Sequence, residues 1–120
     1  MAIIEGRPIT VYGDGTQTRD FVYVKDVARA HMLAASTARS IGKVFNVGAG
    51  VEVSINDLME RIEEVTGKKT TVQHKPWPEG DVRREFGDIS LAEKTIGYSP
   101  ETELTEGIRQ VVRELQSTGG

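Results

Sequence analysis

Hydrophobic and polar positions along this 120-residue chain follow two different periods. Short runs of β-branched and aromatic residues, bounded by Gly or Pro, predict strands. These runs lie at residues 9–12 (ITVY), 21–24 (FVYV), 44–47 (VFNV) and 70–73 (TTVQ). The second run is apolar throughout, so we expect a strand that is buried on both faces.

Longer stretches with apolar residues three or four positions apart predict four helices. The first follows Asp26, which we expect to cap it, and runs to about Ser36. Two others open with a capping box, in which a serine is followed three residues later by an acidic residue. These boxes are Ser54 with Asp57 and Ser90 with Glu93, and the glycines that end the two helices are Gly67 and Gly97. The apolar stripe of the last helix consists of Leu104, Ile108, Val111, Val112 and Leu115.

This alternation of strands and helices predicts an α/β fold, with a small mixed sheet and three to four helices. We find no internal repeat and no linker, so residues 3–116 are predicted to form a single domain. Residues 74–87 are polar and irregular and contain Pro76, Pro78 and Gly80, which predicts a long loop.

Composition narrows the function classes. The chain has 15 Lys and Arg against 18 Asp and Glu, a net charge of −3, which disfavours a dedicated nucleic-acid binder. No run approaches the roughly 18 apolar residues of a membrane helix, and no leader pattern is visible. We therefore expect that the chain binds neither nucleic acid nor a membrane and that it is located in the cytoplasm. The absence of cysteine excludes thiolate metal sites and cysteine nucleophiles.

Several possible sites have a simpler structural interpretation. His31 and His74 lie in different elements without spaced partners, so no metal site is predicted. The turn at residues 48–50 (GAG) is similar to a phosphate loop but lacks the third glycine, which favours a structural turn and no cofactor site. No nucleophile–base pair is apparent, so we predict no catalytic residue.

Two stretches carry candidate chemistry. In residues 12–21, Tyr12 ends one predicted strand and Arg19 precedes the next. Such an arginine can present a planar fork to a phosphate, and such an aromatic ring can stack on a base; the alternative is an Arg–Asp pair that closes a hairpin. Residues 78–88 mix acidic and basic side chains, with a solvated loop as the alternative. Trp77 could anchor this loop or line a pocket.

These stretches resemble the extended short-chain dehydrogenase/reductase family, and more narrowly the NAD-dependent nucleotide-sugar epimerases and dehydratases such as UDP-glucose 4-epimerase. The central match is G-D-G-x-x-x-R-D-F-V-Y-V-x-D-V-A at residues 13–28. Further matches lie at residues 6–12, 44–48, 80–83, 88–92 and 96–100. The resemblance covers residues 3–115 and concerns the C-terminal part of such enzymes.

The resemblance implies a substrate-binding region for a nucleotide sugar, most simply a UDP-sugar. Tyr12 corresponds to the aromatic residue beside the base, Arg19 to an arginine that binds the diphosphate, and Asp81 to an acidic residue that binds the ribose. The family often has an arginine three residues before that aspartate, where this chain has Pro78. Arg83 and Arg84 are the candidates for replacing it, and Arg83 is included in the predicted site.

The family's catalytic motifs lie in its N-terminal Rossmann portion, with its G-x-x-G-x-x-G loop and Tyr-x-x-x-Lys pair. Neither motif occurs in these 120 residues. We therefore expect no cofactor on this chain, although the parent family uses NAD, and we expect weak substrate binding without catalysis. Surface that the family buries against that portion would be exposed, which predicts self-association. The alternative function is a non-catalytic interaction module that reuses the fold to bind a partner chain.

Overall fold

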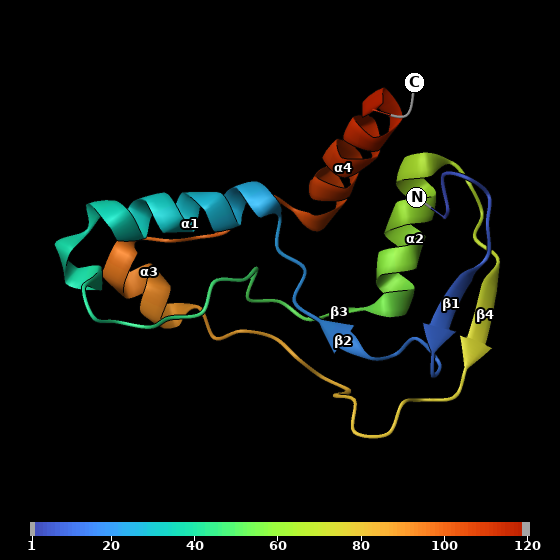
Figure 1. Ribbon diagram of the computed structural model, residues 1–120, viewed down its shortest axis with the longest axis horizontal. Helices are drawn as coiled ribbons and strands as arrows, with labels where there is room; N and C mark the ends of the chain where they lie inside the picture. Colours follow the sequence, from blue (N-terminus) through green and yellow to red (C-terminus); the bar gives the residue numbers. More distant parts are fainter. Residues whose placement is uncertain (1, 119–120) are drawn as a thin grey trace.

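The computed structural model describes residues 2–118, which form a flat molecule of 48 × 39 × 18 Å (Figure 1). Helices and short strands alternate along these residues, which confirms the predicted α/β class with four helices. Where one mixed sheet was predicted, the described strands form two separate two-stranded sheets. The elements are β1 (Ile9–Tyr12), β2 (Thr18–Arg19), α1 (Val24–Ser36), the 3₁₀ turn η1 (Ala38–Ser40), β3 (Val53–Ser54), α2 (Ile55–Thr66), β4 (Val72–Lys75), α3 (Ser90–Ile96) and α4 (Leu104–Thr118).

The first sheet pairs β1 with β4 in parallel, from Ile9 opposite Val72 to Tyr12 opposite Lys75. The strand β1 has its predicted bounds, whereas β4 begins two residues later than predicted. The reason lies in Thr70, whose backbone N–H donates to Glu63 Oε1 at 2.7 Å. This bond ties residue 70 to the end of α2, so that pairing with β1 starts beyond it.

The second sheet pairs β2 with β3 antiparallel, with Arg19 opposite Val53. The strand predicted at residues 21–24 is wrong, because these residues have no strand partner and Val24 already begins α1. The side chain of Tyr23 packs against a helix instead, and Val24 is largely exposed. Tyr23 lies along Gly107 of α4, and its hydroxyl donates to Gln110 Oε1 at 2.8 Å.

The strand predicted at residues 44–47 is also wrong, since this segment is irregular and Val44 is 92% exposed. Phe45 and Val47 pack against the core cluster, which explains their apolar character without a sheet. That cluster joins α1 to α3 and consists of Ala30, Ala92, Ile96 and Tyr98. The alanines let the two helices approach closely.

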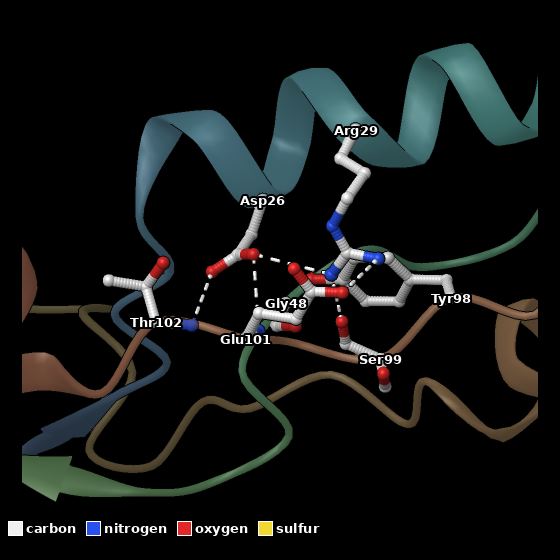
Figure 2. A network of polar contacts seen from close by, with 7 residues as sticks. All are labelled: Asp26, Arg29, Gly48, Tyr98, Ser99, Glu101 and Thr102. Carbon is white, nitrogen blue, oxygen red and sulfur yellow. Dashed lines mark hydrogen bonds and ion pairs between the residues drawn. The ribbon is translucent and has the colours of Figure 1, made fainter.

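Asp26 does not cap α1 as predicted. It lies in the first turn, is buried, and accepts hydrogen bonds from the backbone N–H groups of Glu101 at 3.1 Å and Thr102 at 3.0 Å (Figure 2). Burial opposes ionisation of Asp26, yet these hydrogen bonds and the one from Arg29 outweigh it and hold the pKa of the carboxyl below its ordinary value. The carboxylate therefore joins α1 to the segment before α4.

The same network continues through Arg29 and Tyr98 (Figure 2). The Arg29 guanidinium contacts Asp26, the Ser99 carbonyl and Glu101, and lies 5.6 Å from the centre of the Tyr98 ring. The buried Tyr98 hydroxyl donates to the Gly48 carbonyl at 2.7 Å, and burial raises its pKa. One cluster thus holds three segments that lie far apart in the sequence.

The helix α2 starts as predicted, because Ser54 Oγ accepts from the Asp57 N–H at 3.0 Å, and it ends at Gly67 in the left-handed conformation. The second capping box is wrong. Ile89 occupies the N-cap position of α3, and the Asp88 carboxylate accepts the Ser90 N–H at 2.9 Å. In the described residues, no helix has both the length and the apolar composition of a membrane span.

Candidate functional site

Arg19 ends the two-residue strand β2, and three groups surround its guanidinium. Nη1 donates to the Thr18 carbonyl at 2.8 Å, Nη2 donates to Asp81 Oδ1 at 3.2 Å, and Nε lies 3.6 Å from Glu85 Oε2. About a quarter of the Arg19 side chain is exposed, so part of it is open to solvent. The alternative of a local Arg–Asp pair closing a hairpin is wrong, because Asp81 lies 62 positions along the chain.

The loop between β4 and α3 supplies both acidic partners. It runs beside β2 in Figure 1, where Thr18 N–H donates to the Arg83 carbonyl at 2.9 Å and Glu85 N–H donates to the Thr18 carbonyl at 3.3 Å. Asp81 Oδ1 also accepts the Val82 N–H at 2.8 Å. Although most of its side chains are exposed, the loop is fixed to β2 by its backbone.

Tyr12 ends β1 and is half exposed. The next residue, Gly13, has φ +75° and lies against the indole of Trp77, which follows β4 by two residues. The Arg83 guanidinium lies 4.9 Å from the centre of the same indole, a cation–π distance. Trp77 thus links the end of β1 to the loop. Of the two roles that the sequence left open for it, it has that of an anchor for the loop.

Arg84 is held elsewhere. It makes three hydrogen bonds of 2.8–3.3 Å to the Glu52 carboxylate, and these bonds raise the pKa of Arg84 above its ordinary value. Of the two candidates for a second phosphate contact, Arg83 is the one without a carboxylate in hydrogen-bond contact among residues 2–118. It is close enough to Asp14 to help lower the pKa of that carboxyl, although the main cause is the hydrogen bond from the Thr16 hydroxyl at 2.7 Å.

The structure therefore brings Arg19 and Asp81 into direct contact, and it places Arg83 and Gly13, the residue after Tyr12, against Trp77. Gln17 Nε2 donates to the Tyr12 carbonyl at 2.8 Å, and this bond ties the end of β1 to the residues just before Arg19. Glu85 was missed by sequence reasoning. The signal that could have found it is its place four residues after Asp81 in a loop that already held a predicted ligand.

The turn at residues 48–50, whose sequence is similar to a phosphate loop, has its backbone N–H groups already occupied. A pyrophosphate loop needs free backbone N–H groups at the start of a helix. In the turn at residues 48–50, the N–H groups of Ala49 and Gly50 donate to the Asp20 carboxylate at 2.7 and 3.0 Å, and no helix follows directly. A Cβ on Gly48 would lie 2.4 Å from Asp20 Oδ2, so this glycine serves the close approach of a carboxylate.

Comparison with known proteins gives a consistent result. A family model described as GDP-mannose 4,6 dehydratase matches residues 1–111. A UDP-glucuronate 4-epimerase from Thermodesulfobacterium geofontis is 36% identical over 112 residues, which cover 92% of this chain and 34% of the relative. A putative UDP-glucose 4-epimerase from Methanocaldococcus jannaschii is 40% identical over 107 residues, which cover 89% of this chain and 34% of the relative. The chain thus spans about a third of the length of these relatives.

Solved structures share the backbone. The UDP-glucose 4-epimerase from Thermotoga maritima, solved with UDP-glucose, matches with a TM-score of 0.92 and 34% identity over 99% of this chain and 38% of that one. The UDP-glucuronic acid 4-epimerase from Bacillus cereus, in complex with UDP-glucuronic acid and NAD, matches with a TM-score of 0.86 and 34% identity. This match covers 95% of our chain and 38% of the epimerase chain. The chain therefore belongs to the nucleotide-sugar epimerase and dehydratase family of the GDP-mannose 4,6 dehydratase model, and corresponds to the C-terminal part of such enzymes.

Proposed function

We propose that residues 3–116 form a nucleotide-sugar-binding domain for a UDP-sugar, which binds its ligand but does not transform it alone. The contact between Arg19 and Asp81 carries this proposal. It places a cation for a diphosphate beside a carboxylate that can accept hydrogen bonds from a ribose diol. In this arrangement, Tyr12 lies along the base and Arg83 supplies the second cation near the diphosphate.

The relatives support the ligand class, since they are named as epimerases of UDP-glucuronate and UDP-glucose. Binding by this chain is expected to be weak. Association costs about 4–15 kcal/mol, and two or three charge-assisted contacts of about 1.5–3 kcal/mol each leave little surplus over that cost. Catalysis and NAD binding are assigned to the two-thirds of the relatives that this chain does not match. A cytoplasmic location stays a prediction.

The exposed surface supports a partner. The radius of gyration is 16.8 Å, compared with about 14 Å for a compact domain of this length. The accessible surface is 7866 Å², roughly 1,500 Å² more than a compact monomer of this mass has. One partner in a standard interface buries only about 800 Å². We expect a dinucleotide-binding portion to cover this surface, and a second copy of the chain to cover it where that portion is missing.

A proton–nitrogen NMR titration with UDP-glucose tests the ligand. We expect shifts near Tyr12, Arg19 and Asp81 that disappear in Arg19→Ala. The matched control is Arg39→Ala, which removes an exposed arginine from the turn η1 and leaves the shifts intact. A dispersed spectrum that ignores UDP-glucose, or shifts that survive in Arg19→Ala, would contradict the proposal and favour the interaction module.

A further inference from the structure

Two different carboxylates occupy the binding edge of the Arg19 guanidinium. Nε and Nη2 lie on the same side of the planar group, and together they form the fork that grips a phosphate in a bidentate manner. Here Nη2 contacts Asp81 and Nε contacts Glu85. A diphosphate therefore has to replace at least one of these partners.

Glu85 is the partner that can leave. Its carboxylate lies 3.6 Å from Nε, which is an ion-pair distance and longer than a hydrogen bond, and two-thirds of its side chain is exposed. Asp81 is closer, at 3.2 Å, and its Oδ1 is also fixed by the Val82 N–H. The weaker and more solvated contact is the one that an incoming phosphate displaces.

The backbone of Glu85 stays in place when the carboxylate is displaced. Its backbone N–H donates to the Thr18 carbonyl at 3.3 Å, which keeps residue 85 beside β2. The charged carboxylate then remains near the bound anion, and like charges at short distance repel each other. This repulsion grows with the negative charge of the ligand.

We propose that Glu85 is a counter-ion of Arg19 that makes this site favour the diphosphate diester of a nucleotide sugar over a free nucleoside diphosphate. The inference rests on the proposed function of Arg19 and Asp81. Free UDP ends in a phosphate monoester with a second pKa of about 6, so that at neutral pH it carries about one more negative charge than UDP-glucose. Glu85 weakens the binding of both nucleotides, and it weakens that of UDP more.

The test compares the dissociation constants of UDP and UDP-glucose, measured by NMR titration of the 120-residue chain at fixed low salt. We expect Glu85→Gln to tighten UDP binding by about two- to fivefold, the range of an exposed ion pair, and UDP-glucose binding by less. The control is Glu79→Gln, which removes the same charge from an exposed position in the same loop. It should leave the ratio of the two constants unchanged, and high salt should reduce the effect of Glu85→Gln.

An unchanged ratio in Glu85→Gln, or a ratio that changes equally in Glu79→Gln, would overturn the counter-ion role. The Arg19→Ala variant separates the two levels of the argument. If it abolishes binding while Glu85→Gln has no effect on the ratio, the proposed function stands and the role of Glu85 falls. If the unmodified chain binds neither nucleotide through Arg19, both fall.

Discussion

Gly13 lies so close to Trp77 that a Cβ on the glycine would be 2.7 Å from Cε3 of the indole. That distance is too short for two carbon atoms, and the φ of +75° adds backbone strain for any other residue. Because the indole also contacts Arg83, this packing contact joins the end of β1 to the loop that carries Asp81 and Glu85, in addition to the backbone bonds between that loop and β2.

Gly13→Ala should therefore displace the indole. We expect a loss of unfolding free energy of more than about 1 kcal/mol and a change in the emission of Trp77, the only tryptophan of the chain. The control is Gly80→Ala in the same loop, where φ is +80° but nothing lies within 4 Å of the added Cβ. It carries the strain without the clash, so equal emission spectra for the two variants would contradict the prediction.

The two predicted capping boxes make a second test. Ser54→Ala should cost about 1 kcal/mol of unfolding free energy, because it removes the acceptor of the Asp57 N–H. Ser90→Ala should cost clearly less, since Asp88 accepts the N–H at the start of α3. Chemical denaturation of both variants measures the difference, and a larger effect at Ser90 would mean that α3 is capped as the sequence suggested.

Asp26 predicts a dependence of stability on acid pH. Its pKa in the folded chain lies below its ordinary value of 3.8, so its contribution is fully present above the unfolded pKa and is lost as pH falls through the folded one. Asp26→Asn cannot titrate, and should cost about 1.5–3 kcal/mol near neutral pH. The difference in unfolding free energy between Asp26→Asn and the original chain should shrink below about pH 4.

Urea unfolding between neutral and strongly acidic pH measures this gap. Asp57→Asn serves as the matched control, because Asp57 is an exposed aspartate in the first turn of α2. A gap for Asp26→Asn that stays constant down to the lowest pH would show that the hydrogen bonds to Glu101 and Thr102 do not depend on the charge of Asp26.

Self-association is a fourth prediction, and it follows from the exposed apolar side chains. Met32 on α1 is 71% exposed and Val44 is 92% exposed. Sedimentation at micromolar concentrations should give a mass above that of one chain. Met32→Glu combined with Val44→Glu should lower it, whereas Gln116→Glu with Ser117→Glu adds the same charge at polar positions of α4 and should not. A monomer at all concentrations would exclude self-association.

The local parts of the fold could be predicted from the sequence. Gly67 and Gly97 end their helices in the left-handed conformation, because a helix end depends mainly on neighbouring residues. The strand β1 has the predicted bounds, since Pro8 and Gly13 enclose its β-branched and aromatic run. Residues 21–24 and 44–47 were mistaken for strands because a short apolar run looks the same whether it faces a sheet or a helix. Only the tertiary structure, with Tyr23 against α4 and Val44 exposed, separates the two cases.

The candidate site was predictable only through the family resemblance. Periodicity does not bring Arg19 next to Asp81, because the two residues are 62 positions apart and the elements from α1 to β4 fold between them. Glu85 carries no motif, and its role depends on the backbone bond to Thr18. The choice between Arg83 and Arg84 likewise needed the position of Glu52, which fixes Arg84.

Asp20, the neighbour of Arg19, accepts hydrogen bonds from Ala49 and Gly50 and a third from Gly87 at 3.3 Å. It thereby binds together β2, the turn at residues 48–50 and the loop before α3. In consequence, folding itself already restricts the backbone of Arg19, the residue that we propose binds the diphosphate. The entropy that is lost when Arg19 is ordered is therefore lost largely during folding and not during binding. A nucleotide then binds to a cation whose position is already fixed.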